Sequence, residues 1–364
     1  MYISSLSLSN FRNYSKEKIE FSPYTNVIYG DNAQGKTNIL EAVYLFSQGR
    51  SHRAKSDKEL IKFGEEFSKL SLEFHDNNRD YSASMRLIKN GKKNIKINHV
   101  QITKLSMLMN YLNVVMFSPE DLDLVKGAPS SRRRFMDSSI SQLYPRYLTS
   151  LIDYHKVLAQ KNSLLKALKK QGAHSDVMLS VWNEQLALEA SKIMEYRIEF
   201  INLIDGFASK IQREISGEIL KISYSPGTKS EGIDKSSIFK YFERNQRREI
   251  EFASAQVGVQ RDDLHISVNE NEARIYASQG QQRTAALSMK IAQADYLQSI
   301  KGEYPVLLLD DIMSELDINR RMYLSQKIRD KQVLITSTDT DLIESTGSTK
   351  LFHIKNGSAL REGK

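Results

Sequence analysis

A glycine-containing octapeptide near the N-terminus is the first segment of this sequence that could do chemistry. It reads Gly30-Asp31-Asn32-Ala33-Gln34-Gly35-Lys36-Thr37. This spacing fits a phosphate-binding loop, in which glycines let backbone N–H groups wrap a chain of phosphates. Lys36 would reach the β- and γ-phosphates of a nucleotide, and the Thr37 hydroxyl would bind Mg²⁺. A chance match in a turn is the alternative. A strand-like run precedes the loop and an apolar-periodic helix follows it, which favours nucleotide binding.

Two adjacent carboxylates follow a buried-strand pattern late in the chain. The apolar residues 306–309 precede Asp310 and Asp311, and a carboxylate at the end of a strand can hold Mg²⁺. Apolar runs that end in Asp are common and mostly structural, so this signal is weak by itself. The long separation from the glycine loop argues against a small GTPase or a nucleotide kinase. It suits an ATPase head that is split in the sequence.

A third polar segment, residues 277–283, precedes an expected helix and contains Ser278, Gly280 and Gln281. A Ser hydroxyl, a Gly backbone N–H and the start of a helix form a natural cap for the γ-phosphate of a nucleotide. The alternative is a Gln-rich loop in which Ser278 only caps its own helix. The segment 314–317 lies a few residues after the two carboxylates, and this combination favours the nucleotide interpretation.

The segments that would position these groups are strand-rich at both ends of the chain. Expected helices at 280–299 and 319–329 separate the late strands. Strand-rich sequence on both sides of a helical block predicts one α/β head that is split by an insertion. The expected strands fall at 3–8, 19–21, 26–29, 70–74, 81–87, 92–100, 114–117, 304–309, 332–336 and 351–355.

Residues 131–217 form a helix-rich block with almost no Gly or Pro. Apolar residues recur there at three- and four-residue spacing in two stripes, separated by a break at 171–175. This pattern predicts an antiparallel helical hairpin with arms of about 35–50 Å, at about 1.5 Å per residue. The sequence therefore predicts three parts, which are the N-terminal part of the head at 1–129, an inserted helical lobe at 130–250 and the C-terminal part of the head at 251–364.

The composition limits the possible classes of protein. The 364 residues include 52 Lys and Arg against 44 Asp and Glu, a net charge of +8. Hydrophobic residues at 40% and charged residues at 26% are typical of a globular protein, and the absence of cysteine excludes a disulfide scaffold and a thiolate metal site. No apolar stretch approaches the roughly 18 residues of a membrane span, and Met1–Ser5 lacks the features of a signal peptide. We therefore expect a cytoplasmic protein with no membrane partner, and the basic balance weakly favours a polyanionic partner.

Taken in order along the chain, these motifs resemble the ABC-type ATPase heads of chromosome-maintenance and recombination proteins, and in particular the RecF family. The likeness runs nearly from end to end, and the short helical arm distinguishes this family from its long-armed relatives. It implies an α/β fold, an ABC-type P-loop ATPase head with a mixed sheet and an antiparallel β subdomain, into which a helical arm is inserted. The segments that carry the likeness are 8–14, 30–37, 49–53, 117–122, 132–134, 277–283 and 307–317.

The resemblance implies roles for individual residues. Ser278, Gly280 and Gln281 would belong to a signature motif that contacts the γ-phosphate of ATP bound by a second subunit. ATP would thereby join two chains into a homodimer. Asp310 would be the Mg²⁺ carboxylate, and Asp311 would occupy the place of the acid that polarises the attacking water.

Three positions depart from the pattern of ABC-type heads. Asp311 stands where a Glu is common, Gln279 where the signature usually has Gly, and Thr338 where many heads carry a switch His. Because the Asp311 carboxylate would sit further back than that of a Glu, we expect ATP binding with slow hydrolysis, at most a weak DNA-dependent ATPase. Arg12 would contact the nucleotide, as the corresponding Arg does in similar heads, or it would be a surface residue after a strand.

The function that the resemblance implies is ATP-dependent DNA binding in recombinational repair, replication and the SOS response. The expected partners are single-stranded, gapped or junction DNA and the RecR and RecO proteins. One alternative is the ATPase subunit of a membrane transporter, although the helical insertion and the basic charge argue against it. Another is a structural DNA clamp that binds ATP and barely hydrolyses it. Arg50, His52 and Arg53 are candidate phosphate contacts, with a solvated basic turn as the alternative. Arg132, Arg133 and Arg134 are a second candidate DNA contact, and the alternative there is an exposed face or packing on carboxylates. Around an expected hairpin turn, four lysines would contact phosphates if that edge faces DNA, namely Lys89, Lys92, Lys93 and Lys96.

Overall fold

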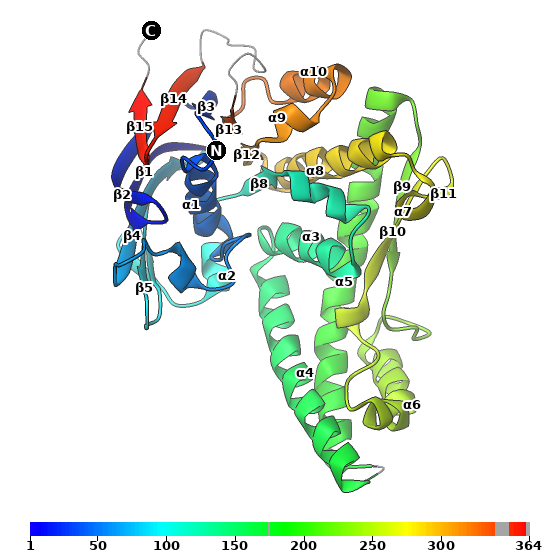
Figure 1. Ribbon diagram of the computed structural model, residues 1–364. Coiled ribbons are helices and arrows are strands. Elements are labelled where there is room, and N and C mark those ends of the chain that lie inside the picture. The colour runs from blue at the N-terminus through cyan, green and yellow to red at the C-terminus, as the bar shows by residue number, and fades with distance from the viewer. Residues whose placement is uncertain (174, 339–348, 362–364) are drawn as a thin grey trace. The chain divides into compact units, whose positions relative to one another are not determined.

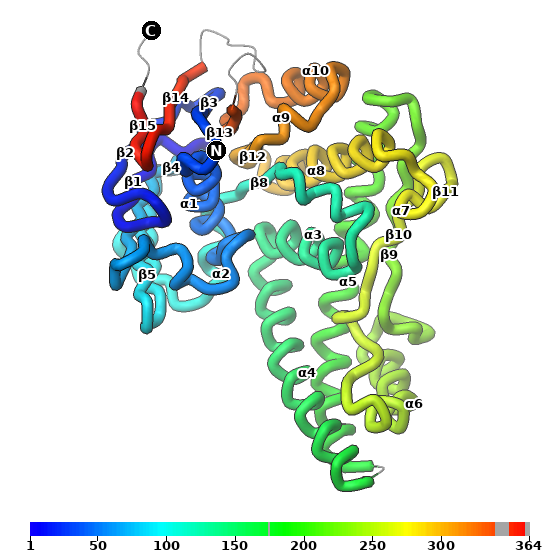
Figure 2. The backbone as a smooth tube through the Cα atoms, viewed as in Figure 1, coloured from blue at the N-terminus to red at the C-terminus, as the bar shows by residue number. Residues whose placement is uncertain are grey.

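The computed structural model describes residues 1–173, 175–338 and 349–361, and Figures 1 and 2 trace the chain. The chain divides into two compact units. Unit 1 comprises Met1–Asp121 and Lys290–Lys364, and unit 2 comprises Leu122–Met289. The domain boundaries that the sequence places after residues 129 and 250 stay predictions. His174, in the expected break between two helices, lies outside the described residues.

A mixed six-stranded sheet lies at the centre of unit 1, in the order β15-β14-β3-β13-β12-β8. Its strands run parallel except β15, which is antiparallel to β14. The register pairs Asp310 with Thr336 and Ser337 with Tyr29, so the carboxyl ends of β12, β13 and β3 share one edge. Every residue of β8 and β13 is buried, as is usual for parallel strands that are covered on both faces. The bounds are β3 Thr25–Tyr29, β8 Val114–Phe117, β12 Val306–Asp310, β13 Val333–Ser337, β14 Lys350–Lys355 and β15 Ser358–Arg361.

The second six-stranded sheet of unit 1 is antiparallel, in the order β2-β1-β4-β5-β6-β7. Buried residues alternate with more exposed ones along β4 and β5, which is the expected pattern of half-buried strands. Side chains of both sheets and of the first helix pack in one hydrophobic cluster. The bounds are β1 Tyr2–Phe11, β2 Tyr14–Glu20, β4 Phe67–His75, β5 Asp80–Ile88, β6 Asn94–Ile97 and β7 Val100–Ile102.

Helix α1, Lys36–Gln48, packs against β8, β12 and β13 of the mixed sheet and against β4. It follows β3 directly through the glycine loop, so the loop lies at the carboxyl edge of the mixed sheet. Among the described residues, the other helices that lie wholly in unit 1 are short. They are α2 Leu105–Leu108, α9 Ile312–Glu315 and α10 Ile318–Lys327. One 3₁₀ turn lies at Asp57–Leu60, and another at Pro119–Leu124 crosses into unit 2.

Two long helices form the arm of unit 2, α4 at Pro145–Gln171 and α5 at Val177–Ser216 (Figure 1). With 27 and 40 residues, they are about 40 and 60 Å long at about 1.5 Å per residue. The hairpin confirms the expected arm, but α5 is longer than the 35–50 Å inferred from its apolar stripe. It continues to Gly217, which ends it in a left-handed conformation with φ of 75°, because glycine adopts this conformation at little cost.

Unit 2 also contains a small antiparallel sheet, in the order β11-β10-β9, that the sequence patterns did not predict. Helix α6, Lys235–Phe252, was not predicted either, and it packs against both α5 and α4. Helix α8, Gln279–Lys301, begins in unit 2 and ends in unit 1. The other elements are α3 Pro129–Ser141, β9 Leu220–Ser225, a 3₁₀ turn at Val259–Arg261, β10 Asp263–Val268, β11 Asn271–Glu272 and α7 Ala273–Tyr276.

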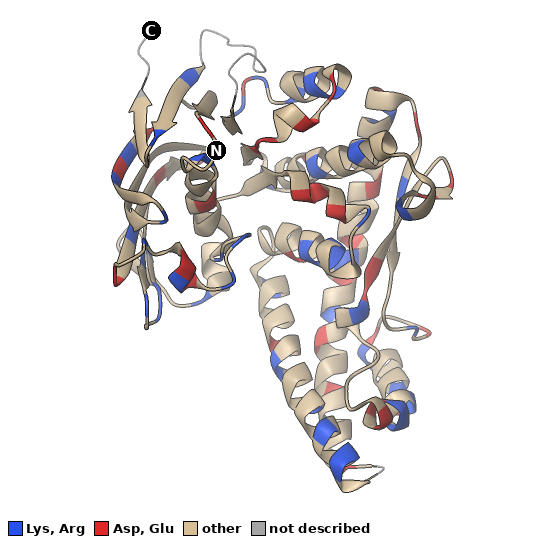
Figure 3. Ribbon diagram, in the orientation of Figure 1, with Lys and Arg blue, Asp and Glu red and all other residues tan. Residues whose placement is uncertain are grey.

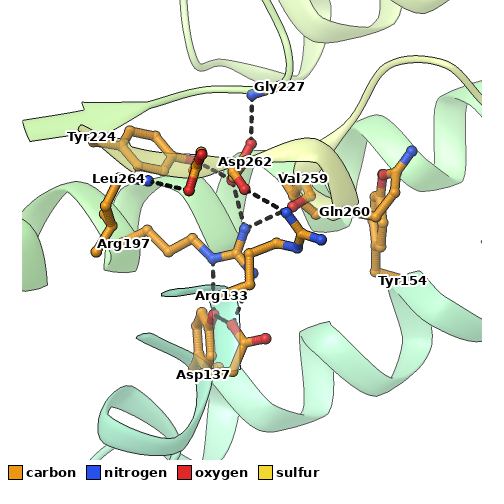
Figure 4. Close-up of polar contacts among 12 residues, drawn as sticks. Arg133, Asp137, Tyr154, Arg197, Tyr224, Gly227, Val259, Gln260, Asp262 and Leu264 are labelled. Atoms are coloured by element: carbon orange, nitrogen blue, oxygen red, sulfur yellow. Dashed lines mark hydrogen bonds and ion pairs between the residues drawn. The ribbon is translucent and has the colours of Figure 1, made fainter. Parts of the chain in front are cut away.

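A buried ion network joins α3, α4, α5 and the segment before β10 within unit 2 (Figure 4). Arg197 of α5 is 1% exposed, and its guanidinium pairs with Asp137 at 2.8 Å and with Asp262 at 2.5 Å. The remaining partners are the Tyr147 hydroxyl and the Val259 carbonyl for Arg197, and the Tyr224 hydroxyl and the Gly227 N–H for Asp262. The network therefore supplies the paired charges and hydrogen bonds that a buried cation requires.

Candidate nucleotide site

Two residues of the glycine loop, Gly30 and Gly35, have backbone conformations and surroundings that leave no room for a side chain. Gly30 has φ of 141° and Gly35 has φ of 113°. A Cβ on Gly30 would lie 2.5 Å from the Ile354 carbonyl oxygen, and one on Gly35 would lie 2.5 Å from the Asn13 amide nitrogen. Helix α1 starts after Gly35, which has no side chain to cap it, and its first turn contains no acidic residue. Backbone N–H groups at a helix start and the positive end of the helix dipole suit an anion at this point.

The Lys36 ammonium lies folded over the loop that carries it. Its Nζ donates to the Gly30 carbonyl at 2.6 Å and to the Asp31 carbonyl at 2.9 Å, and the residue is 8% exposed. Burial lowers the pKa of Lys36, and the nearby charges of Asp311, Asp31 and Asp310 oppose that shift. Both hydrogen-bond acceptors are neutral carbonyls, so the ammonium can turn to a phosphate without leaving a buried carboxylate unpaired.

Thr37 and Asp310, far apart in the sequence, meet at the carboxyl edge of the mixed sheet. The Thr37 hydroxyl donates to Asp310 Oδ1 at 2.7 Å, and the Thr336 hydroxyl donates to the same oxygen at 2.8 Å. The contact between Asp310 and Thr336 follows from the register, because the pairing of β12 with β13 places these two residues opposite each other. A hydroxyl and a carboxylate side by side are oxygen ligands of the kind that Mg²⁺ prefers.

These ligands would not complete a metal site on their own. The described residues contain no group of three or more His, Asp or Glu that could hold a metal ion. Mg²⁺ commonly binds through one or two protein oxygens together with the phosphates of a nucleotide. The donor set therefore fits a cation that arrives with a nucleotide.

Asp311 lies beside this pair in a left-handed conformation with φ of 52°, as the residue before α9. Its N–H donates to the Thr336 hydroxyl at 3.0 Å, and its carbonyl accepts from the Ser314 hydroxyl at 2.8 Å. Burial raises the pKa of Asp311, with Lys36 opposing and Asp310 adding to the shift. Hydrogen bonds at both its N–H and its carbonyl thus fix the Asp311 backbone, and this limits where its short side chain can reach.

Arg12 has a partner that neither interpretation of the sequence included. Its guanidinium binds the fully buried Glu41 of α1 with two hydrogen bonds, at 2.8 and 2.7 Å. The Ser51 hydroxyl also donates to Glu41, at 2.5 Å. Burial would raise the pKa of Glu41, but the hydrogen bonds from Arg12 and Ser51 and the charge of Arg12 hold it below its ordinary value. The nucleotide contact of Arg12 stays a prediction.

Several residues that hold the loop were missed by the sequence patterns. The Asn13 amide donates to the Gln34 carbonyl at 2.7 Å and accepts from Asn38 at 2.9 Å, and the Tyr14 hydroxyl donates to the Gly35 carbonyl at 3.0 Å. Asn13 and Tyr14 belong to the same 8–14 segment as Arg12, and that proximity was the available signal. The N–H of Asn356 also donates to the Gln34 side chain, at 2.7 Å, and no local pattern points to it.

Ser278 caps its own helix in unit 2. Its hydroxyl accepts from the Gln281 N–H at 3.3 Å, and its own N–H donates to the Gln281 side chain at 2.8 Å, a reciprocal capping box. The Gln281 side chain also donates to Glu218 at 2.6 Å, and the Gly280 carbonyl accepts from the Thr284 hydroxyl at 2.9 Å. The capping alternative is therefore realised in this structure. The γ-phosphate contact of Ser278, Gly280 and Gln281 stays a prediction.

Comparison with known proteins places the chain in a family. The family model described as the RecF/RecN/SMC N terminal domain matches residues 2–359. The chain is 42% identical to the DNA replication and repair protein RecF of Bacillus cereus (strain G9842), over 98% of both chains, and equally similar to that of Bacillus thuringiensis (strain Al Hakam). The chain belongs to the RecF family of DNA replication and repair proteins.

Solved structures agree with this family. The chain is similar to the recombination mediator protein RecF-ATPrS of the RecFOR pathway, with a TM-score of 0.93, 35% identity and coverage of 100% of this chain and 98% of that one. An Smc head bound to the C-winged helix domain of ScpA gives a TM-score of 0.57 at 16% identity, which shows a shared fold alone. The expected ATPase-head architecture with a helical arm is thereby confirmed. No helix in the described ranges is long and apolar enough to cross a membrane.

The basic run Arg132–Arg134, a candidate DNA contact in this RecF-family chain, is largely engaged inside unit 2. Arg132 is buried, and its guanidinium pairs with Asp263 at 2.6 and 2.9 Å. Arg133 donates to the Asp262 carbonyl at 2.8 Å, whereas Arg134 is exposed. The run therefore packs on carboxylates and backbone over most of its length, which was the structural alternative.

The lysines around the β5–β6 turn are also partly engaged. Lys93 pairs with Asp57 at 2.9 Å and Lys89 pairs with Glu66 at 3.1 Å, while Lys92 and Lys96 are exposed.

Burial lowers the pKa of His52, although the charges of Glu41 and Asp310 oppose this. A neutral His52 is a poor phosphate contact, so charge on its segment comes from Arg50 and Arg53, which are exposed.

Proposed function

We propose that this chain is an ATP-dependent DNA-binding protein of recombinational repair and replication that dimerises on ATP and hydrolyses it slowly. The observation that carries the proposal is the arrangement at the carboxyl ends of β3 and β12. There Thr37 donates to Asp310, and the Lys36 ammonium lies over the glycine loop. The titles of the similar RecF structures name ATP and ATPrS, which supports the same ligand class here. Family membership argues against the alternative of a transporter ATPase subunit.

Each group at the loop has a role toward ATP. The backbone of Gly30–Thr37 and the start of α1 would hold the phosphates, and Lys36 would bind the β- and γ-phosphates. Thr37 and Asp310 would hold Mg²⁺, which neutralises charge on the phosphate oxygens. The Arg12 guanidinium is already bonded to Glu41 and to the Glu59 carbonyl, so we place it second among the expected contacts.

Slow hydrolysis follows from the position of Asp311. A general base must reach the water that attacks the γ-phosphate, and Asp has a side chain one methylene shorter than that of Glu. The Asp311 backbone is also bonded through its N–H and its carbonyl, which restricts any compensating movement. A clamp that binds ATP and barely turns it over is the second candidate function, and the same observation favours it.

Dimerisation would use the signature residues Ser278, Gly280 and Gln281 against ATP bound by a second chain. Two large apolar side chains immediately before Ser278 support an interface there. Ile275 is 64% exposed and Tyr276 is 71% exposed, and such side chains are typical of surfaces that become buried on association. ATP would then favour the dimer because its γ-phosphate supplies contacts that ADP lacks.

DNA would be held mainly through its phosphates, as the net charge of +8 suggests. Single-stranded or gapped DNA and junctions are the proposed substrates. The similar structures belong by title to the RecFOR pathway, which supports RecO and RecR as partners. A DNA-repair role also supports the cytoplasmic location expected from the sequence.

The central test replaces Lys36. Lys36→Ala is expected to weaken ATP binding at least about tenfold, because a charge-assisted contact contributes about 1.5–3 kcal/mol, and to abolish ATP-dependent DNA binding. The matched control is Lys16→Ala, an exposed cation of the same unit with no proposed contact to nucleotide or DNA. Fluorescent-nucleotide titration and DNA anisotropy are the measurements. A Lys36→Ala protein that binds ATP as tightly as the parent would refute the nucleotide site.

A mixing experiment tests the composite dimer. Lys36→Ala and Ser278→Arg should each be inactive as ATPases alone, but a heterodimer of the two keeps one intact site. Random association should restore about a quarter of the parental activity. A stable monomer at saturating ATP, or no recovery in a mixture shown to contain heterodimers, would rule out the composite site.

A further inference from the structure

The outward face of α6 carries a row of basic side chains. Its buried residues include Ile238, Phe242 and Ile250, whereas the face opposite them presents exposed cations. Their spacing of four, three and one residues keeps them on one side of the helix. These exposed cations are Lys240, Arg244, Arg247 and Arg248.

A second basic segment adjoins this row at the end of α4. Lys166, Lys169 and Lys170 are exposed there. The ends of the two helices meet over one apolar cluster, formed by Leu165, Leu168, Leu179 and Ile250. The buried pair Lys161–Glu249, at 2.6 Å, also joins α4 to α6. Figure 3 shows basic residues at the end of α4 and along α6. We call Lys166, Lys169, Lys170, Lys240, Arg244, Arg247 and Arg248 the outer-arm basic surface.

The charges of this surface are little compensated. Arg244 approaches Glu231 only to 4.0 Å, with both side chains largely exposed, and Arg248 lies 5.8 Å from the centre of the Phe252 ring. Elsewhere on unit 2, exposed lysines such as Lys156 and Lys192 pair with acids at 2.8 Å. Even with exposed Glu251 at the end of α6, the surface keeps a clear positive excess.

We propose that the outer-arm basic surface binds the sugar-phosphate backbone of DNA, an inference that rests on the proposed DNA-binding function. The residues from Lys240 to Arg248 span about 12 Å of helix, at about 1.5 Å per residue. Duplex DNA presents one negative charge per about 1.7 Å of its axis, so several phosphates would face these cations. Arginine forks suit phosphate oxygens, and such contacts position DNA without reading its sequence.

The surface has a property that the interior run Arg132–Arg134 lacks. Its side chains are exposed and can move to a ligand without breaking a buried pair, whereas Arg132 would have to leave Asp263. Binding here would release counterions from DNA and would weaken steeply with salt. The arm then contributes a contact that does not depend on the nucleotide loop.

The test removes four charges in each of two variants. The surface variant is Lys240→Gln, Arg244→Gln, Arg247→Gln and Arg248→Gln, since Gln preserves helix propensity. The control variant is Lys156→Gln, Lys192→Gln, Lys210→Gln and Lys221→Gln, four other exposed cations of unit 2. Labelled duplex and single-stranded DNA are titrated by anisotropy across a KCl series, with thermal melting and ATP binding measured for every protein.

The surface variant should bind duplex DNA at least about tenfold more weakly at low salt, with a salt slope reduced by about 2 to 4. For single-stranded DNA the salt slope should fall by about 2 to 3. Melting and ATP binding should be unchanged, and the control variant should lose far less DNA affinity. Equal losses in both variants would attribute the effect to net charge and overturn the assignment. Full DNA affinity in the surface variant would overturn it too and would point to an acidic protein as the partner of this face. A parent protein that binds no DNA would instead refute the proposed function itself.

Discussion

Lys36 in the glycine loop and Arg197 in the arm are both buried cations, at 8% and 1% exposure, yet their partners differ. Lys36 donates to two backbone carbonyls. Arg197 is shared between two carboxylates, a hydroxyl and a carbonyl. Taking Lys36 away breaks no hydrogen bond to a carboxylate, whereas taking Arg197 away removes the charged partner of two carboxylates. The first arrangement leaves a cation available to a ligand, and the second holds four chain segments together.

The anions of the two regions differ in the same way. Asp310 accepts from the hydroxyls of Thr37 and Thr336, and neither donor carries a charge. Asp262 accepts from a guanidinium, a hydroxyl and an N–H in a fully buried position. A hydroxyl donor brings no positive charge, so these two bonds do not pair Asp310 with a cation. Lys36 and Asp310 can therefore exchange their uncharged partners for a ligand, whereas Arg197 and Asp262 are already paired with each other.

The largest expected effect comes from breaking the arm network. Arg197→Met should lower the free energy of unfolding by about 3–5 kcal/mol, because removing one partner leaves buried charges uncompensated. Urea denaturation measures this, and Lys192→Met, a more exposed cation of the same helix, is the control, with an expected change within about 0.5 kcal/mol. Lys36→Ala should have little effect on stability in the same assay. A loss for Arg197→Met no larger than that of the control would erase the contrast between the two regions.

A smaller effect is expected at Asp310, the carboxylate of the candidate nucleotide site. Asp310→Asn should keep the fold and retain some nucleotide affinity, but the gain that Mg²⁺ gives should fall at least about tenfold, or about 1.4 kcal/mol. Titration of a fluorescent nucleotide with and without Mg²⁺ measures it. Exposed Asp123→Asn is the control. Unchanged Mg²⁺ dependence would remove Asp310 from the metal site.

The smallest effect is a pH dependence that can be assigned to each region separately. Burial lowers the pKa of His52, near Asp310, and of His155, near Asp137 and Arg197, below the ordinary 6.5. The folded state therefore prefers the neutral rings. The unfolded chain takes up protons first, so stability is complete above pH 6.5 and falls as the pH drops below it.

Melting temperatures between pH 8 and pH 5.5 test this, with His52→Gln and His155→Gln as the variants. Each substitution should flatten the pH dependence, because Gln does not titrate. His52→Gln reports on the nucleotide region and His155→Gln on the network. If both variants follow the parental pH profile, other groups control stability in acid.

Local sequence patterns predicted the local structure of those parts of the candidate site that lie within one segment. The loop, the run that ends in Asp310 and the helix that starts near Ser278 all have residue types dictated by their own backbone. The hairpin of α4 and α5 was likewise predictable from its apolar stripes, because burial of one face requires that spacing. Its exact end was not, since Gly206 continues the helix and Gly217 ends it.

The partners of these groups could not be predicted, because they depend on strand pairing across the whole chain. Thr336 reaches Asp310 only through the pairing of β12 with β13. Glu41 has the sequence context of an ordinary helix residue, and only the fold turns its side chain inward to Arg12. Arg132 carries a charge that suggests exposure until β10 brings Asp263 to it.

The position of β3 in its sheet has a consequence for the making of this protein. Its two neighbours, β13 and β14, both come from the last part of the chain. A ribosome adds about 5–20 residues per second, so the roughly 300 residues between β3 and β13 take about 15–60 s to synthesise. The antiparallel sheet ends at Ile102, early in synthesis, and unit 2 ends at Met289, before β13 begins at Val333. We therefore expect the nucleotide loop to be the last part of the protein to take shape, and a chain released before residue 333 to carry an arm without a working head.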